Sequence, residues 1–419
     1  MTGEGVVSER AQRWAATMSG HNAGGAAVRR AHGEFPRAIQ SADQPGTDQL
    51  AGALSGPAPL SGAPDPPGGA ARIGAADRLG AVGPFGREER EVAEDASLAP
   101  GATRGVGAGD RPRPEEPDPL RTCFERDRDR ILHSAPFRRL AGKTQVFIFP
   151  DDHQRTRLTH ALEVAQVATA VARACRLNVA LTEAIALGHD CGHGPGGHAS
   201  EDALTPYLPE GFDHAVWGAD VVLQSSNLCR ETSDGIRNHS WNRPAPATPE
   251  GEVVSWADRI AYVCHDFEDA VEAGIVTDEM LPASVSARCG RSRSRQLGAF
   301  MAGLVSGTLS TGSVAMTEPF AEALADFRAC NYERIYLRPS SVTQGSAVVS
   351  LLRALVEHFA DRPNLLPAVG FPGIEAGSDA AVRAAITYVA GMTDRFACQT
   401  AVSQLGWDTS RLPRSGRGM

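Results

Sequence analysis

Residues 183 to 201 read Glu183-Ala-Ile-Ala-Leu-Gly-His-Asp-Cys-Gly-His-Gly-Pro-Gly-Gly-His-Ala-Ser-Glu201, an apolar run followed by a glycine-rich turn. The run from 180 to 190 predicts a helix that ends at His189-Asp190, because glycines and a proline then break it. Between His189 and His198 stand three histidines, one aspartate and four glycines, a combination with no purpose in core packing. Imidazole and carboxylate groups gathered at a helix end indicate a divalent metal site.

Two neighbouring segments extend this prediction outward. Residues 156 to 175 have apolar residues at helical spacing and place His160 early in the expected helix. Residues 250 to 274 predict another helix, on which Asp258, Tyr262 and Asp266 fall on one stripe. A buried stripe of two carboxylates and a phenol is costly unless it is paired or binds something. Each residue alone fits a core or solvated role equally well, so the joint pattern carries the prediction.

The rest of the chain predicts a mainly α fold. Residues 1 to 115 contain stretches rich in Gly, Pro and Ala, such as 56 to 70, and predict a disordered extension. That extension is either a regulatory arm or an unselected addition. Residues 116 to 275 are interpreted as the metal-binding domain and 276 to 419 as a helical region packed on it. Further helices are expected at 213–224, 315–329, 345–360 and 377–404, and a strand at 144–149.

Net charge, cysteine content and the distribution of apolar residues indicate which ligands and which cell compartment to expect. The 419 residues carry a formal net charge of −9, which argues against nucleic acid as the main ligand. An anionic substrate would therefore need local basic groups or a metal. Eight cysteines without a CxxC pair indicate reduced thiols. With no apolar run of about 18 residues and no secretory signal, we expect no membrane span and a cytoplasmic protein.

Several ordered motifs resemble the HD-domain superfamily, and within it the deoxyguanosine triphosphate triphosphohydrolase-like proteins. The resemblance runs from about residue 118 to 404 and implies a helical HD bundle with additional C-terminal helices. Order and spacing match throughout, which is far more specific than the bare His…His-Asp…Asp pattern. The matching stretches are residues 128–147, 155–166, 183–190, 197–201, 257–270 and 388–397.

The resemblance implies hydrolysis of a deoxynucleoside triphosphate, dGTP-like, to the deoxynucleoside and inorganic triphosphate. It implies a divalent ion (Mg, Mn, Co, Ni, Fe or Zn) held by four ligands: His160, His189, Asp190 and Asp258. His198 would protonate the leaving 5′-oxygen, and Glu201, three residues on, would orient it. A helix N-terminal charge is the alternative for Glu201. His193 matches a residue near the phosphates, and His214 another active-site position.

Substrate contacts follow from the same resemblance. Arg157 and the pair Arg139 and Lys143 would hold the triphosphate, since guanidinium suits bidentate phosphate contact. Gln145 aligns with a sugar contact, Tyr262 with a residue stacked under the deoxyribose, and Asp266 with a partner of the 3′-hydroxyl. For each cation, a solvated surface charge is the competing interpretation. The resemblance also implies a homo-oligomer with a deoxynucleotide effector.

Three positions depart from the family pattern. Gly196 stands where relatives usually have Phe, Ala215 where they commonly have Asn, and Thr387 where they often have Asp. None of them is a predicted metal ligand. They leave two alternatives open: another HD-type nucleotide phosphohydrolase, such as a nucleotidase or phosphodiesterase, and a nucleotide-binding regulatory protein.

Overall fold

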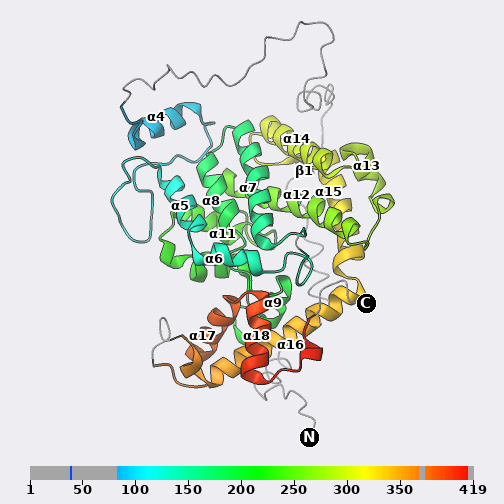
Figure 1. Ribbon diagram of the computed structural model, residues 1–419. Helices are drawn as coiled ribbons and strands as arrows, with labels where there is room; N and C mark the ends of the chain where they lie inside the picture. The colour runs from blue at the N-terminus through cyan, green and yellow to red at the C-terminus, as the bar shows by residue number, and fades with distance from the viewer. Residues whose placement is uncertain (1–37, 40–82, 152, 368–372, 414–419) are drawn as a thin grey trace, which may run out of the picture.

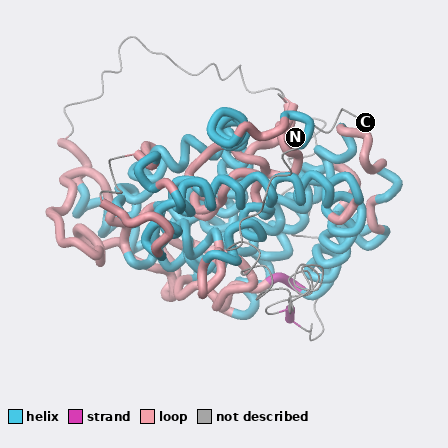
Figure 2. Tube along the Cα trace, turned by 90° about the horizontal axis from the view of Figure 1, so that it is seen from below, coloured by secondary structure: helices cyan, strands magenta, loops and turns pink. Residues whose placement is uncertain are grey.

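The computed structural model describes residues 38–39, 83–151, 153–367 and 373–413 and is built almost entirely of helices (Figure 1), which confirms the mainly α prediction. Two short strands, β1 (Ala38–Ile39) and β2 (Met316–Thr317), pair in parallel (Figure 2). The helices are α4 (Arg87–Ser97), α5 (Cys123–Leu132), α6 (Ala135–Arg139), α7 (Arg157–Ala174), α8 (Val179–Gly188), α9 (His198–Leu204), α10 (His214–Trp217), α11 (Arg230–Asn238), α12 (Pro249–Glu272), α13 (Ala283–Cys289), α14 (Arg293–Thr311), α15 (Glu318–Asn331), α16 (Pro339–Asp361), α17 (Asp379–Ala390) and α18 (Asp394–Leu405).

Two hydrophobic cores organise these helices. The larger core is formed mainly by α5, α7, α8, α11, α12, α14 and α15. The smaller core is formed by α9, α16, α17 and α18, which lie together in the lower part of Figure 1. The turn between α8 and α9 therefore runs from one core to the other. The predicted boundary between residues 275 and 276 stays a prediction.

Helix α8 is the central element of the larger core. Seven of its ten residues are buried, and it packs against α5, α7 and α12. Its N-cap, Asn178, accepts a hydrogen bond from the amide of Leu181 at 3.1 Å, an interaction worth about 1 kcal/mol. Burial of a side chain such as Ile185 contributes roughly 1.5–3 kcal/mol. Because α8 is held on three sides, the residues at its C-terminal end are placed rigidly.

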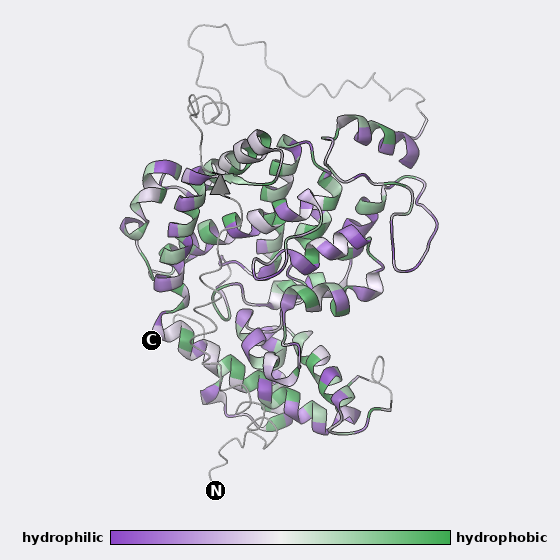
Figure 3. Ribbon diagram, turned by 180° about the vertical axis from the view of Figure 1, so that it is seen from behind, coloured by the Kyte–Doolittle hydropathy of each residue, from purple (hydrophilic) through white to green (hydrophobic). Residues whose placement is uncertain are grey.

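The N-terminal prediction needs correction between residues 83 and 115. This part of the predicted disordered extension contains α4, a mostly hydrophilic helix with no buried residue (Figure 3). The segment after it docks on the body, because the buried Arg111 guanidinium pairs with Asp127 and donates to the carbonyl of Cys123. The prediction of disorder depended on the lack of apolar residues in this segment. Buried ion pairs and hydrogen bonds such as those of Arg111 offset that lack. Residues 1–37 and 40–82 lie outside the described residues.

Three predicted elements differ from the structure. Residues 144–149 form no strand: the Thr144 amide donates to Asp394, and Phe149 has a positive φ of 53°. Residues 377–404 form two helices, because Thr393 caps a new helix start after Gly391. Residues 213–224 form the short α10 and then a π-helical turn. The predicted helices at 156–175 and 250–274 are confirmed as α7 and α12.

All eight cysteines are free thiols, and six of them are buried. This agrees with the expectation of reduced cysteines. Among the helices of the described ranges, none combines the length and apolarity needed to cross a membrane.

Candidate metal centre and active site

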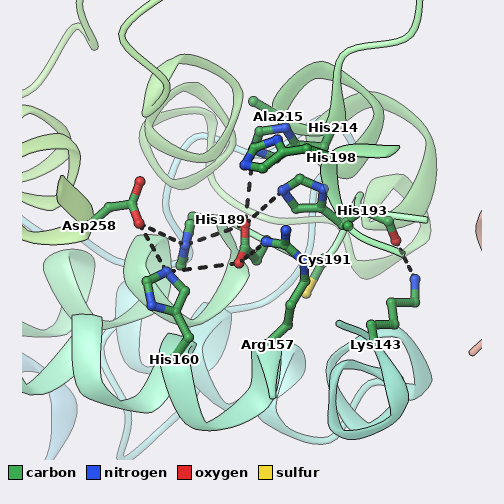
Figure 4. A network of polar contacts seen from close by, with 12 residues as sticks. Lys143, Arg157, His160, His189, Cys191, His193, His198, His214, Ala215 and Asp258 are labelled. Carbon is green, nitrogen blue, oxygen red and sulfur yellow. Dashed lines mark hydrogen bonds and ion pairs between the residues drawn. The ribbon is translucent and has the colours of Figure 1, made fainter. Parts of the chain in front are cut away.

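Three helices bring the four predicted metal ligands together, and Figure 4 labels three of them, His160, His189 and Asp258. His160 lies near the start of α7, His189-Asp190 follows α8 directly, and Asp258 lies in α12. Nε2 of His160 is 3.0 Å from Oδ1 of Asp258 and 4.0 Å from Oδ2 of Asp190. Nε2 of His189 is 3.8 Å from the same Asp258 oxygen and 3.5 Å from Oδ1 of Asp190. Each imidazole nitrogen is thus within 4.0 Å of both carboxylates.

These donor atoms fit a divalent ion. Metal–ligand distances of about 2.0–2.2 Å place the ligands of one ion roughly 3–4 Å apart. Nδ1 of His189 lies 2.6 Å from the carbonyl oxygen of Ala186; since a carbonyl only accepts, Nδ1 carries the proton and Nε2 presents a lone pair. That buried Nε2 has no hydrogen-bond partner among the described residues. A buried polar atom without a hydrogen-bond partner destabilises the fold unless something binds it.

Electrostatics keeps the two carboxylates of this cluster ionised. Burial would raise the pKa of Asp258, but the hydrogen bond to His160 and the nearby His189 hold it below the ordinary value. Burial likewise opposes ionisation of Asp190, but Arg157, His189 and His193 together outweigh it, so that the pKa of Asp190 lies well below the ordinary value. For His160, burial lowers the pKa, but the hydrogen bond to Asp258 and the surrounding carboxylates raise it on balance. The cluster presents the negative charge that a cation requires.

Arg157 is the basic residue tied most closely to this cluster. Its buried guanidinium donates through Nη1 to Oδ2 of Asp190 at 2.7 Å. Its Nε and Nη2 atoms are buried and have no partner among the described residues. Gly197 leaves room for it, because a Cβ there would lie 2.7 Å from Nη2. Arg157 thus has unused donors beside the metal-ligand candidates.

The predicted acid/base residues border the metal-ligand candidates on one side. His198 begins α9, and its side chain is 74% exposed. The two carboxylate oxygens of Glu201 face different histidines. Oε2 lies 3.4 Å from Nδ1 of His198, and Oε1 lies 2.7 Å from Nδ1 of His214. The rings of His193 and His214 stack at 3.7 Å, and Nε2 of His193 is 3.2 Å from Oδ1 of Asp190. All four predicted catalytic residues therefore lie together, with Glu201 held more closely by His214 than by His198.

His239, which the sequence analysis missed, completes this cluster. It caps the C-terminus of α11, and its Nε2 lies 3.3 Å from Nε2 of His214. Burial, together with His189 and His214, lowers its pKa to about 3. The only sequence signal was a histidine ending the polar segment 230–238, which carries too few apolar residues to mark a buried helix.

The predicted phosphate contacts Lys143 and Arg139 are placed differently from each other. The buried ammonium of Lys143 donates to the carbonyl oxygens of His193 and Ala390, so it links the glycine-rich turn to α17. Burial, followed by the repulsion of Arg139, lowers its pKa to about 7. Arg139 is exposed at the end of α6. The phosphate roles of both residues stay predictions.

The predicted sugar contacts line α12 and its neighbours. The hydroxyl of Tyr262 accepts a hydrogen bond from Nε of Arg328 at 3.1 Å. Oδ2 of Asp266 accepts from the hydroxyl of Tyr336 at 2.5 Å, and burial raises the pKa of this carboxyl to about 7. Oδ1 of Asp266 and Oε1 of Gln145 are buried acceptors without a partner among the described residues. Both acceptors are free to meet a hydroxyl donor.

Two of the departures from the family pattern, Gly196 and Ala215, lie in the glycine-rich turn and next in sequence to His214. Gly196 has a φ of +72°, and a Cβ there would lie 2.5 Å from Cγ1 of Val348, so this turn has no space for a large side chain. Its amide donates to Oδ1 of Asp394 at 2.8 Å, which anchors the turn on α18. Ala215 is buried next to His214. Thr387 is part of α17, where its hydroxyl donates to the carbonyl of Arg383.

The helical fold and the His, His-Asp and Asp ligand candidates on α7, directly after α8 and on α12 are typical of a metal-binding hydrolase of the HD type. The HD domain family matches residues 157–263, and the phosphohydrolase-associated domain matches residues 314–402. The first match begins at Arg157 and includes all four metal-ligand candidates. The chain is therefore an HD-domain phosphohydrolase.

Similar sequences show to which family of HD-domain phosphohydrolases the chain belongs. A deoxyguanosinetriphosphate triphosphohydrolase-like protein of Caldanaerobacter subterraneus subsp. tengcongensis is 40% identical over 319 residues, covering 74% of this chain and 93% of the relative. A protein of the same description from Clostridium perfringens is 38% identical, covering 68% of this chain and 87% of the relative. A solved structure of a hypothetical protein from Aquifex aeolicus aligns over 68% of this chain and 69% of that chain, with 18% identity and a TM-score of 0.43. The chain belongs to the deoxyguanosinetriphosphate triphosphohydrolase-like family, which confirms the family resemblance.

Proposed function

We propose that this protein hydrolyses deoxynucleoside triphosphates, dGTP-like in base, to the deoxynucleoside and inorganic triphosphate. The observation that carries the proposal is the convergence of two groups. The four metal-ligand candidates and the His193, His198, Glu201 and His214 cluster meet at one carboxylate, Asp190, which is 3.2 Å from His193 and 3.5 Å from His189. The names of the relatives support the substrate class.

The metal centre would consist of His160, His189, Asp190 and Asp258. A divalent ion bound there supplies Lewis-acid activation of water and offsets charge on the phosphoryl oxygens. The chain holds the ligands ready for it: Ala186 fixes the tautomer of His189, and Arg157 orients Asp190. Such preorganisation by neighbouring groups is what tunes a metal site.

Proton transfer is assigned to His198 and Glu201. Water adds to the α-phosphorus, the bond between this phosphorus and the 5′-oxygen breaks, and the leaving oxygen takes one proton to become the 5′-hydroxyl. His198 would donate that proton, because it is exposed towards solvent and its Nδ1 faces the Glu201 carboxylate. Glu201 would orient the ring. The attacking water loses one proton. This proton replaces the one that His198 has given to the 5′-oxygen, so His198 is ready for another cycle.

Substrate binding is assigned to the remaining predicted residues. The free donors of Arg157 suit phosphoryl oxygens, and Lys143 and Arg139 add positive charge near the glycine-rich turn. Oδ1 of Asp266 and Oε1 of Gln145 would accept from sugar hydroxyls, and Tyr262 would stack under the deoxyribose. A homo-oligomer with a bound deoxynucleotide effector remains part of the proposal, as the resemblance implies.

A second candidate function is another HD-type nucleotide phosphohydrolase, a nucleotidase or phosphodiesterase. Gly196 and Ala215 favour it, since both replace residues usual in the family beside the predicted acid/base histidines. The products separate the two functions. A nucleotidase releases orthophosphate, and a phosphodiesterase leaves a nucleoside monophosphate, whereas the first proposal requires inorganic triphosphate.

The test is product analysis with each of the four deoxynucleoside triphosphates in Mn²⁺ or Mg²⁺. We expect deoxynucleoside and triphosphate in equal amounts from the wild type and neither from His189→Ala. His133→Gln changes an exposed histidine after α5 and should retain activity. Release of orthophosphate alone, or no turnover of any of the four with ion bound and with the other deoxynucleotides present as effectors, would contradict the proposal.

A further inference from the structure

Two buried cysteines that are far apart in the sequence meet where α5 and α11 begin. Cys123 is the first residue of α5, and Cys229 is the N-cap of α11. Their exposed fractions are 1% and 0%. A Cβ atom built on Gly109 would lie 3.3 Å from Sγ of Cys123 and closer still to Sγ of Cys229. Both sulfurs therefore lie within 3.3 Å of one point.

The two thiols also affect each other's ionisation. As the hydrogen-bond partner, the Cys229 thiol lowers the pKa of the Cys123 thiol, and the same contact raises the pKa of Cys229. The start of a helix favours a thiolate as well, because unpaired backbone amides point towards it. The charged groups facing the pair are Arg111, which donates to the carbonyl oxygen of Cys123, and Asp127, which accepts from the amide of Cys229. Of the two cysteines, Cys123 is thus the better nucleophile.

A loop with little side-chain cover lies over the sulfurs. Besides Gly109, which has a φ of +77°, Gly105 also faces the pair, since its Cβ would lie 3.3 Å from Sγ of Cys123. Val106, between these two glycines, is 69% exposed. Surface loops with few buried apolar contacts open locally at much lower free energy than core helices do. Opening of residues 105–109 would admit a small oxidant to the sulfurs.

We propose that Cys123 and Cys229 form a reversible disulfide, with a small-molecule disulfide such as oxidised glutathione as the oxidant. The Cys123 thiolate attacks one sulfur of the oxidant, whose S–S bond breaks and releases one glutathione thiolate. The Cys229 thiol gives up its proton and attacks the Cys123 sulfur of the mixed disulfide, and the second glutathione leaves. The two glutathione thiolates take up the two protons that the cysteines release. The cysteine pair loses two electrons, and the oxidant gains them.

This bond would join the starts of α5 and α11. It would close a loop from residue 123 to residue 229, which contains α7 and α8 with three of the metal-ligand candidates. A cross-link over a long loop restricts the unfolded chain and so stabilises the fold. The inference is independent of the proposed function, because neither cysteine is a metal-ligand candidate or a predicted substrate contact.

The experiment equilibrates the full-length protein with oxidised glutathione, or with reduced glutathione as the reference, and then alkylates the remaining thiols in denaturant. Intact mass spectrometry and a non-reducing digest locate every sulfur. After reduced glutathione, we expect all eight cysteines to be alkylated. After oxidised glutathione, we expect a peptide cross-linked between Cys123 and Cys229 and a higher Tm, both reversed by dithiothreitol. Glutathione attached to other cysteines appears as added mass and is counted separately.

Cys229→Ser is the matched variant, because serine is favoured at an N-cap and the variant should fold. It should form no cross-link, and oxidised glutathione should not raise its Tm. Cys398→Ser changes a half-buried thiol of α18 and should form the Cys123–Cys229 bond as the wild type does. If Cys229→Ser does not fold, the wild-type digest decides.

Three results in the wild type would overturn the proposal. Both thiols could stay alkylatable in oxidised glutathione, Cys123 could carry glutathione without any cross-link, or either cysteine could be joined to a different one. A rise in Tm that persists in Cys229→Ser would likewise show that oxidation stabilises the protein at another site.

Discussion

Replacing Arg157 by Met should destabilise the metal-free protein strongly. The Arg157 guanidinium and the Asp190 carboxylate are 3% and 4% exposed and form a 2.7 Å ion pair. Removing one partner of such a pair typically costs about 3–5 kcal/mol, because the other charge stays buried and uncompensated. We therefore expect Arg157→Met to lower the free energy of unfolding by about 3 kcal/mol or more in EDTA. Added Mn²⁺ should recover part of the loss, since the ion also compensates Asp190.

Urea denaturation in EDTA measures this, within a double-mutant cycle. Asp190→Asn in the Arg157→Met background removes the stranded charge, so the double variant should be more stable than the sum of the single effects predicts, by about 2–3 kcal/mol. Arg173→Met, an exposed change in the same helix, should stay within about 0.5 kcal/mol of the wild type. A loss below about 1 kcal/mol for Arg157→Met, or additive single effects, would refute the reasoning.

Four further predictions concern the same site. His198→Gln should lower kcat by about 10²–10⁴-fold with little change in KM, since it removes the proposed acid; steady-state kinetics with an active deoxynucleotide measure both constants, and an unchanged kcat would exclude this role. Asp266→Asn should change the dependence of stability on pH: burial raises the pKa of this carboxyl from 3.8 to about 7, so the folded protein holds a proton that the unfolded chain has released, and wild-type stability falls as the pH rises from about 4 to about 7. In EDTA this fall should be shallower in Asp266→Asn, and parallel pH profiles would contradict the assignment. Gly192→Ala should cost about 1–3 kcal/mol by overpacking, because its Cβ would lie 2.0 Å from the carbonyl oxygen of His214; urea denaturation with stability near that of the wild type would show that the turn adapts. Chelation should lower the Tm of the wild type but not of His189→Ala, because an ion that binds only the folded state stabilises it; equal shifts in a thermal melt would place the ion elsewhere.

Helices with a regular apolar pattern could be predicted from the sequence, and so could the residues on them. Helix α7 and helix α12 follow the predicted ranges 156–175 and 250–274 closely. His160, Asp258 and the His189-Asp190 pair therefore converge as the periodicity and the glycine break indicate. Local pattern is sufficient here because each ligand lies on, or directly after, an element that the pattern itself defines.

Features that depend on tertiary contacts could not be predicted in the same way. His239 reaches the site only because α11 packs against α8 and α12, and nothing in its neighbouring residues marks it. The sequence predicts Lys143 to be a phosphate-binding cation. In the structure its ammonium donates hydrogen bonds to two carbonyl oxygens. Arg155, two residues before Arg157, forms ion pairs with Glu163, Glu268 and Asp269. Which partner a charged side chain finds is decided by packing and not by its own sequence position.

The most direct test of the central claim is hydrolysis of deoxynucleoside triphosphate in ¹⁸O-labelled water, followed by mass spectrometry of both products. Attack of water on the α-phosphorus predicts one ¹⁸O atom in inorganic triphosphate and none in the deoxynucleoside. His189→Ala should yield neither product. Label in the deoxynucleoside, or products limited to orthophosphate, pyrophosphate or a nucleoside monophosphate, would contradict the account.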